Sequence, residues 1–269
     1  MNTFRFRSGR TPLLISFPHV GTYVPADIDA RMTDAGRRVE DTDWHVDELY
    51  DFAAELGAGL MVASHSRYVV DLNRSPDNQP LYPGQRNTEI VPTTTFRDEA
   101  IYQPGKEPSD GEIKERLIQY WRPYHAKLAQ ELAWLREKYG VAVLWDAHSI
   151  RSQVPRFFTG KLPDLNFGTL NQTSADPALA RRLVEVAQKD KRYTSVLNGR
   201  FKGGFITRNF GRPMLQVHAV QLEMSQAVYM VEEPPYTLLR DKVAQVREVL
   251  HNLLHETLEW ASQRATIPF

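Results

Sequence analysis

Apolar runs that pass directly into polar residues place the strongest limit on how this chain can fold. In AVLWDAHSI, residues 142–150, an apolar run continues into Asp146 and His148. Such a run is typical of a strand buried on both faces of a parallel sheet. Side chains alternate between the faces of a strand, so Asp146 and His148 are expected to point the same way. Ligands of open α/β sheets bind at the carboxyl ends of strands, which makes the pair a candidate site. The alternative is that both groups are only hydrogen-bonded at the edge of a loop.

Stretches with helical periodicity alternate with the apolar runs. Residues 109–140, 176–190 and about 235–262 carry apolar side chains at three- and four-residue spacing. Pro123 is expected to kink or split the first of these helices, and Asp176 to cap the second. This alternation favours an α/β fold, in which one sheet packs between helices.

Two further segments complete the predicted organisation. Residues 41–59 are predicted to form a helix capped by Asp41, Thr42 or Asp43. Residues 75–109 are instead rich in Pro, Asn and Gly, and a stretch of that length with little regular structure is often functional. We therefore expect a single domain over residues 1–269, with 75–109 as an irregular insertion or a lid.

The composition excludes several classes of function. Lys plus Arg equals Asp plus Glu at 33 each, so no basic excess indicates a nucleic-acid partner. The chain has no cysteine, which excludes disulfides, thiolate metal ligands and a cysteine nucleophile. The N-terminus lacks the apolar region of a secretory signal, and no apolar run has the length of a membrane span. We expect a soluble cytoplasmic protein with a small-molecule partner; the oligomeric state does not follow from the sequence.

Four apolar segments, each predicted to be a strand, end in reactive groups: LLISFPHVG, YVVDLNRSP, VAVLWDAHS and VHAVQLEMS. The groups that they deliver are His19, Asn73, Arg74, Asp146, His148 and Glu223. If these strands are neighbours in one sheet, the groups converge at one edge. Any one of them alone could be structural, but four together favour a functional site.

His19 and His148 are candidate metal ligands, because neutral imidazole is a common ligand at physiological pH. A catalytic zinc site takes three protein ligands and keeps a position open, and two histidines with one carboxylate are a standard set. The segment DTDWHVDELY offers the acids Asp41, Asp43, Asp47 and Glu48. We favour Asp43, because it precedes a helix that would hold it rigidly.

The remaining acids have other expected roles. Asp41 is expected only to cap the helix and to offset its dipole. Asp47, one turn after Asp43, and Asp146, two residues before His148, are expected to orient the ligands from behind. Glu223 follows an apolar run, so partial burial should raise its pKa and suit it to act as a general base. The alternative for Glu223 is a buried ion pair with an arginine.

Arginines gather near these segments and indicate an anionic substrate, because a guanidinium binds carboxylate with two hydrogen bonds. Arg67 and Arg74 flank the apolar run YVVDL. A second basic group lies in RFKGGFITRNFGRP and consists of Arg200, Lys202, Arg208 and Arg212. Arg74 is the strongest candidate, because it directly follows a predicted strand. Surface solubility is the competing explanation for most single arginines.

Seven segments together resemble the N-formylglutamate amidohydrolase family, over roughly residues 10–260. They are SFPHVGTYVP, DTDWHVDELYDF, SRYVVDLNRSP, WDAHSI, LPDLNFGT, NGRFKGGFITRNFG and VQLEMSQ. The resemblance implies a fold similar to that of the zinc carboxypeptidases, with a mixed, largely parallel sheet. It also implies hydrolysis of N-formyl-L-glutamate to L-glutamate and formate, a step of histidine degradation.

The resemblance carries roles onto particular residues. The two metal histidines of the carboxypeptidase pattern fall on His19 and His148, the catalytic glutamate on Glu223, and the carboxylate-binding Asn-Arg pair on Asn73 and Arg74. Two loops that look like the pocket loops of the family add Asn166 and Lys202 as binding candidates. The sequence departs from the carboxypeptidase H-x-x-E pattern, because Thr22 stands three residues after His19. The third ligand must therefore come from elsewhere, and Asp43 is the expected source.

The resulting hypothesis is a zinc-dependent amidohydrolase. Zinc held by His19, Asp43 and His148 would act beside the general base Glu223, and Mn²⁺, Co²⁺ or Fe²⁺ could replace zinc at such a site. The substrate carboxylates would be bound by Asn73, Arg67 and Arg74, with Arg208 as a further candidate. The rival hypotheses are a carboxypeptidase-like or other N-acyl amino acid deacylase on the same scaffold, and a non-catalytic module that binds dicarboxylates.

Overall fold

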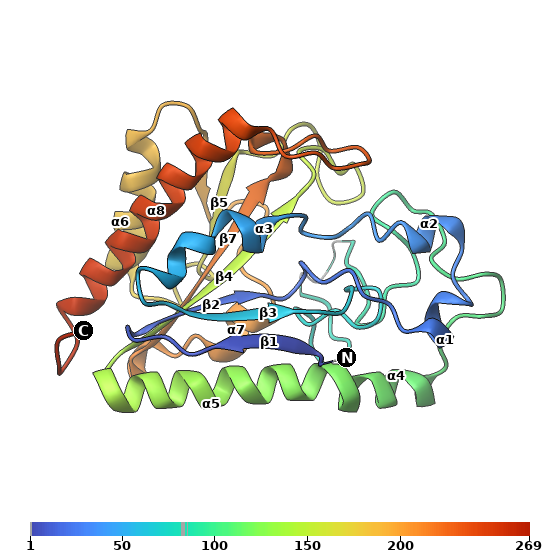
Figure 1. Cartoon of the computed structure of the whole chain (residues 1–269), viewed down its shortest axis with the longest axis horizontal. Helices are drawn as coiled ribbons and strands as arrows, with labels where there is room; N and C mark the ends of the chain where they lie inside the picture. Colours follow the sequence, from blue (N-terminus) through green and yellow to red (C-terminus); the bar gives the residue numbers. More distant parts are fainter. Residues whose placement is uncertain (1, 82–83, 85) are drawn as a thin grey trace.

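A computed structural model describes residues 2–81, 84 and 86–269 of the chain. One seven-stranded sheet runs through this part of the molecule, in the order β1-β3-β2-β4-β7-β5-β6 (Figure 1). Its strands are β1 (Phe4–Arg7), β2 (Leu13–Phe17), β3 (Gly59–Ala63), β4 (Ala142–Ile150), β5 (Leu165–Gly168), β6 (Ser195–Leu197) and β7 (Val217–Ser225).

The sheet is mixed, and its centre is parallel. Strands β3, β2, β4 and β7 pair in parallel, whereas β1 joins β3 and β5 joins β7 in antiparallel fashion. Strands β2, β4 and β7 are therefore adjacent, and their carboxyl ends lie at the same edge. The expected α/β fold with a mixed, largely parallel sheet is confirmed.

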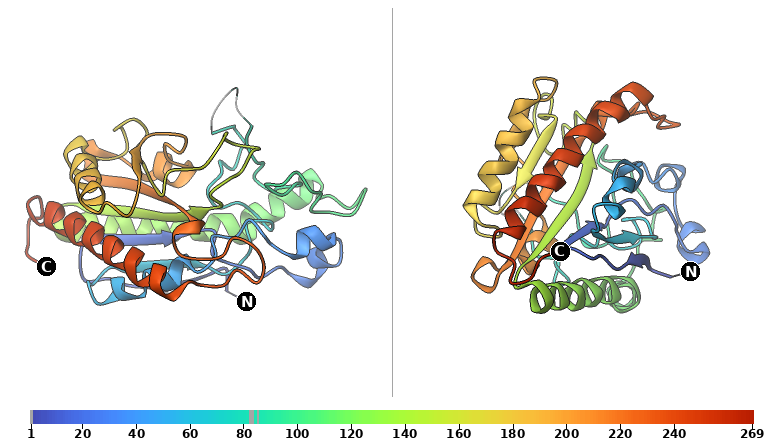
Figure 2. Two further views of the ribbon diagram at one scale, coloured as in Figure 1. Left: turned by 90° about the horizontal axis from the view of Figure 1, so that it is seen from above. Right: turned by 60° about the vertical axis from the view of Figure 1, so that its left-hand side comes forward.

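Helices cover both faces of the sheet (Figures 1 and 2). The helices are α1 (Ala26–Asp29), α2 (Asp34–Arg37), α3 (Val46–Leu49), α4 (Asp110–Arg116), α5 (Arg122–Tyr139), α6 (Pro177–Lys189), α7 (Phe205–Phe210) and α8 (Arg240–Ser262). Apolar side chains of α3, α6 and α8 pack on one face of β2, β4 and β7. Apolar side chains of α5 and α7 pack on the other face.

Two of the helix predictions can be compared in detail. The long stretch before β4 is interrupted but not split, because α4 continues through a π-helical turn at Leu117–Trp121 into α5, and Pro123 lies in the first turn of α5. Proline lacks the amide hydrogen of a regular helix, and π turns commonly accompany such interruptions. Asp176 caps α6 by accepting a hydrogen bond from the Ala178 amide at 2.7 Å.

Three of the predictions for secondary structure are wrong. Residues 41–59 form only the single turn α3 and a 3₁₀ turn at Asp51–Ala54, and α3 has no side-chain cap. Asp41 instead accepts hydrogen bonds from the Tyr68 hydroxyl at 2.6 Å and the Phe96 amide at 2.9 Å. The last helix begins at residue 240 rather than about 235.

The third error concerns YVVDL, residues 68–72, which is not a strand. The Val69 amide donates to the Ser66 carbonyl in a tight turn, and the Asp71 amide donates to the Ile90 carbonyl. Tyr68 and Val69 are nevertheless buried in the cluster that packs on α5. The run is apolar because it is buried, and burial alone does not distinguish a strand from an irregular segment.

Residues 75–109 form a long irregular segment, within which residues 82, 83 and 85 lie outside the described residues. No helix or strand is assigned to the part of this segment that the structure describes. Across the described ranges of the chain, none of the helices combines the length and the apolarity needed to cross a membrane.

Candidate active site

The adjacent strands β2, β4 and β7 position three of the predicted groups. His19 follows β2 after Pro18, while His148 and Glu223 lie in β4 and β7 themselves. His148 is in register with Glu223 across the parallel pair, so both side chains are presented on the same face. All three residues are buried. The sheet therefore brings together groups that are far apart in the sequence.

Asp43 reaches the same point from the loop that precedes α3. Its amide donates to the His19 carbonyl at 3.0 Å, which fixes the loop against the end of β2. One carboxylate oxygen, Oδ2, lies 3.0 Å from His148 Nδ1 and 3.8 Å from His19 Nδ1, and it accepts from the Ser149 amide at 3.2 Å. Asp43 therefore points into the site and does not cap the helix.

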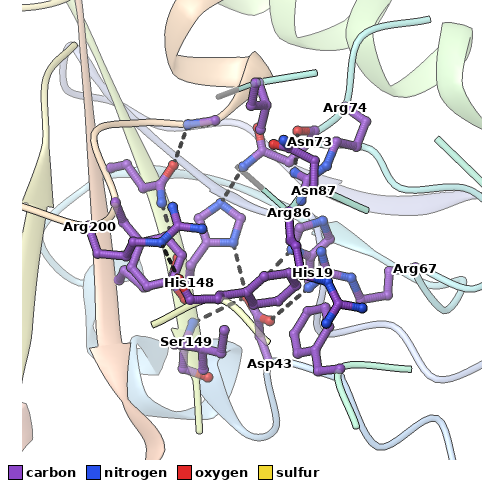
Figure 3. A pocket seen from close by; sticks show the side chains of 18 residues that line it. His19, Asp43, Arg67, Asn73, Arg74, Arg86, Asn87, His148, Ser149 and Arg200 are labelled. Carbon is purple, nitrogen blue, oxygen red and sulfur yellow. Dashed lines mark hydrogen bonds and ion pairs between the residues drawn. The ribbon is translucent and has the colours of Figure 1, made fainter. Parts of the chain in front are cut away.

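The side chains of His19, Asp43 and His148 form a group that fits a metal ion (Figure 3). One ligand atom from each residue lies within 4.8 Å of the others. Ligands at zinc bond lengths in a tetrahedral site are separated by about 3.3 Å, close to the distances found here. The other oxygen of Asp43, Oδ1, is buried and has no hydrogen-bond partner in the described part of the chain. A cation would satisfy this oxygen.

A carboxylate stands behind each histidine. His19 Nε2 lies 2.7 Å from Asp71 Oδ1, and His148 Nε2 lies 3.1 Å from Asp146 Oδ2. A proton on each Nε2 leaves Nδ1 free to bind a metal, and this arrangement fixes the ring and increases its basicity. Asp146 thus lies where the sequence predicts it. Sequence reasoning missed Asp71, although its position two residues before Asn73 at the end of an apolar run was the available signal.

The electrostatics of the two histidines reflect these partners. Burial and the neighbouring Arg67 lower the pKa of His19 below its usual value. Burial also disfavours a charged His148, but the carboxylates of Asp146 and Asp43 outweigh it and raise the pKa of His148 well above its usual value. The negative carboxylates that favour a proton on His148 also favour a metal cation there, because the proton and the metal ion both bring positive charge to the same place.

Glu223 lies beside this group in a nearly dry environment. Burial raises the pKa of Glu223 to about 8. Its side chain accepts a hydrogen bond from Gln221 Nε2 at 3.1 Å, and Gln221 Oε1 in turn accepts from the Gly204 amide at 2.6 Å. Asn166 donates to the backbone carbonyl of Glu223 at 3.1 Å from the adjacent strand β5. Asn166 therefore holds the strand and does not face the cavity.

Arg67 and Asn73 are buried among these residues. Arg67 donates to Asp71 Oδ2 at 2.6 Å, and its Nη1 lies 3.9 Å from Asp43. Asn73 Oδ1 accepts from the Ile206 amide at 2.8 Å, and its amide nitrogen lies beside His148 Nε2 at 3.0 Å and donates to Asp146 Oδ2 at 3.5 Å. Both side chains thus line the cavity while fixed by other residues.

Arg74 is more accessible, and it is oriented by the segment 75–109. Its guanidinium donates to the backbone carbonyl of Thr88 at 3.2 Å and to the Thr88 hydroxyl at 2.7 Å. It lines the same cavity as Arg67 and Asn73. The segment 75–109 therefore contributes to the site through the residues that orient Arg74.

Three other predicted residues are placed elsewhere. Asp47 forms an ion pair with Arg5 at 3.3 Å and does not contact the two histidines among its described partners. Lys202 and Arg208 do not line the cavity as far as the structure describes it. The described part of the structure thus gives no support to the orienting role predicted for Asp47 or to the binding roles predicted for Lys202 and Arg208.

The cavity has a volume of about 60 Å³. Sequence reasoning did not single out several of its lining residues: Leu81, Arg86, Asn87, Phe96, Phe157 and Phe201, and it noted Arg200 only as one member of a basic group. They come from irregular segments, in which neither periodicity nor spacing indicates where a side chain points.

A buried histidine–aspartate group at the ends of parallel strands, with a carboxylate of raised pKa beside it, is an arrangement that suits hydrolysis by an enzyme built on an α/β sheet. Comparison with known proteins agrees. The chain belongs to the N-formylglutamate amidohydrolase family, whose sequence model matches residues 11–230.

Individual relatives cover almost the whole chain. The N-formylglutamate deformylases of Pseudomonas putida and Pseudomonas aeruginosa are each 49% identical to it over 259 residues, which is 96% of this chain and 97% of the relative. The crystal structure of N-formylglutamate amidohydrolase from Ralstonia eutropha JMP134 superimposes with a TM-score of 0.82 at 24% identity, covering 98% of both chains. A gene product of Agrobacterium tumefaciens shares the fold, with a TM-score of 0.71 at 16% identity and 96% of both chains covered.

Proposed function

We propose that this protein hydrolyses N-formyl-L-glutamate to L-glutamate and formate. The observation that carries the proposal is the 49% identity to two N-formylglutamate deformylases over 96% of the chain. The cavity supports it independently, because it combines a buried histidine–aspartate group, a carboxylate of raised pKa and several arginines.

The metal that we propose is zinc, held by His19, Asp43 and His148. Two imidazole nitrogens and one carboxylate suit zinc, and Mn²⁺, Co²⁺ and Fe²⁺ are the alternatives that such ligands accept. When bound, the ion would supply a Lewis acid that polarises the formyl carbonyl and lowers the pKa of the attacking water. Asp71 and Asp146 hold the two imidazoles in the orientation that this role requires.

Glu223 is the proposed general base. Its pKa of about 8 lies close to neutrality, where proton transfer in both directions is effective. In its ionised form it accepts the proton of the attacking water, and in its protonated form it donates that proton to the leaving nitrogen of glutamate. Gln221 keeps the carboxylate in place through the hydrogen bond from its amide.

Asn73 and Arg74 are proposed to bind the α-carboxylate of the substrate, with Arg67 nearby. Only the α-carbon separates this carboxylate from the scissile amide nitrogen, so it must lie close to the metal group. Asn73 meets that condition, because its amide contacts His148. The placements of Lys202, Arg208 and Asn166 give no support to the substrate-binding roles predicted for them.

The direct test is release of formate from N-formyl-L-glutamate by the purified protein, measured as isolated, after chelation and after zinc is added back. We expect activity that is lost with chelator and restored by zinc. N-acetyl-L-glutamate serves as the matched substrate, since it differs by one methyl group. Absence of formate under all three conditions, with zinc bound, would contradict the proposed substrate.

A further inference from the structure

We propose that Arg200 binds the second, γ-carboxylate of the substrate and thereby selects glutamate over residues with a neutral side chain. The inference rests on the proposed function, because it assumes N-formyl-L-glutamate as the ligand of the cavity. It assigns a specificity-determining role to a residue outside the Asn73–Arg74 pair.

The sheet order separates Arg200 from the other arginines of the site. Arg67 and Arg74 belong to the loop after β3, on one side of β2, whereas Arg200 follows β6, beyond β7 and β5 on the other side. The candidate metal ligands lie between them, as Figure 3 shows. Arg200 nevertheless lines the same cavity. The cavity thus has cationic side chains on two opposite walls.

The substrate has anionic groups at matching positions. Its α-carboxylate is attached to the carbon that carries the scissile nitrogen, whereas its γ-carboxylate is two methylene groups further along the chain. If Asn73 and Arg74 bind the first group near His148, the second group must reach a wall away from them. Arg200 is the cationic side chain of that wall among the described lining residues.

The surroundings of Arg200 fix its guanidinium before substrate arrives. Nε donates to the Phe157 carbonyl at 2.7 Å, and the guanidinium carbon lies 5.4 Å from the ring centroid of Phe201 and 6.0 Å from that of Phe157. A planar guanidinium held by a carbonyl and by aromatic faces loses little entropy when it binds a carboxylate. The same two rings line the cavity and offer an apolar surface to the methylene groups.

Arg86 is the competing candidate, because it also lines the cavity. Its guanidinium lies 2.7 Å from Asp98, and more than half of its side chain is exposed, with 59% accessible to solvent. An exposed ion pair of this kind is screened by water and would contribute less to recognition. Arg200 is only partly exposed, so its interaction with a carboxylate is screened less.

The test compares N-formyl-L-glutamate with N-formyl-L-glutamine, which has nearly the same shape and lacks the charge. In Arg200→Met, we expect KM for the glutamate substrate to rise by roughly 10- to 100-fold, the usual range for a hydrogen-bonded charge. We expect kcat for that substrate, and KM for the glutamine substrate, to change by no more than a few-fold. Arg200→Lys should fall between Arg200→Met and the wild type. Arg181→Met, on the solvent face of α6, is the control for loss of a positive charge.

Binding of L-glutamate and L-glutamine, measured by calorimetry, separates this inference from the proposed function. If the wild type hydrolyses N-formyl-L-glutamate and Arg200→Met keeps the preference for glutamate over glutamine, the role of Arg200 is overturned and the proposed function stands. The same conclusion follows if only Arg86→Met loses that preference. A wild type without hydrolysis, whose preference for L-glutamate over L-glutamine depends on Arg200, supports the inference and contradicts the proposed activity. If the wild type shows no hydrolysis and no selective binding of L-glutamate, both the role of Arg200 and the proposed function are contradicted.

Discussion

Asp71 and Asp146 contact His19 and His148, respectively, from separate parts of the chain. Asp146 precedes His148 by two residues in one strand, so strand geometry alone brings them together. Asp71 reaches His19 across 52 residues of sequence and also neutralises Arg67. Burial disfavours its ionised form, but Arg67 and His19 outweigh that effect and hold the pKa of Asp71 well below its usual value. It therefore remains a carboxylate able to orient His19.

At the scale of one residue, the proposed role of Glu223 as general base can be tested by substitution. Glu223→Gln keeps the size of the side chain but removes the proton acceptor, so we expect kcat to fall by roughly 10²- to 10⁴-fold. Zinc affinity should stay within a few-fold, since Glu223 lies outside the group that fits the metal. Formate release and zinc titration with a competing chelator measure the two effects. Full activity in Glu223→Gln would remove Glu223 from the mechanism, and Glu256→Gln on α8 is the matched control.

At the scale of elements, the start of α7 holds two side chains of the site in place. Its first residues donate to Gln221 through the Gly204 amide and to Asn73 through the Ile206 amide. One short helix thus fixes both the neighbour of Glu223 and the neighbour of His148. Gly204 allows this close approach, because a Cβ at that position would lie 2.2 Å from Asn73 Nδ2.

Gly204→Ala should therefore impair the site through Asn73. Because the added methyl group must displace the Asn73 side chain, we expect a loss of stability of about 1–3 kcal/mol and at least a several-fold fall in kcat/KM. Denaturant unfolding and formate release measure these changes. Gly111→Ala in α4 is the control: its Cβ would lie 3.8 Å from the nearest atom, and alanine favours a helix. Equal behaviour of the two variants would contradict the role assigned to α7.

The irregular segment 75–109 acts on the site through particular contacts. Thr88 orients Arg74, and Phe96 is tied to the loop before α3 by the hydrogen bond from its amide to Asp41. The Arg67 guanidinium carbon also lies 4.9 Å from the ring centroid of Phe96. That the segment closes over substrate as a lid stays a prediction.

At the scale of the whole molecule, buried histidines outside the site link stability to pH. Burial lowers the pKa of His125 and that of His218 to about 4. His218 Nδ1 accepts a hydrogen bond from the Asp176 amide at 3.1 Å, and its ring contacts Trp260 edge-on at 4.7 Å. A proton on Nδ1 would break that hydrogen bond between the start of α6 and strand β7.

The sign of the effect follows from the pKa values. The folded-state pKa of His218 is below its unfolded value of 6.5, so its contribution is complete above that pH and is lost as pH falls toward 4. Between pH 7 and pH 5 we expect it to lower the free energy of unfolding by about 2 kcal/mol. His218→Asn should flatten the pH dependence by this amount in denaturant unfolding, whereas the exposed His255→Asn should not. Identical slopes in all three proteins would contradict the assignment.

Local signals were enough to predict much of this protein. Apolar runs and helical spacing predicted β2, β4, β7, α5 and α6, because burial imposes a period on any element that packs on a core. Residues that follow such runs, among them His19, His148 and Glu223, could be singled out because strands deliver side chains to a common edge.

Only the tertiary structure decided the rest. Asp71 contacts His19 from a run that was predicted to be a strand and is irregular, and Arg200 lines the cavity from a segment without periodicity. The sequence by itself indicated that β2, β4 and β7 are buried strands and that His19, His148 and Glu223 lie at or near their carboxyl ends, since these features depend on local pattern. The order of the strands, and with it the neighbours of each group in space, depends on packing between distant segments, which no local pattern encodes.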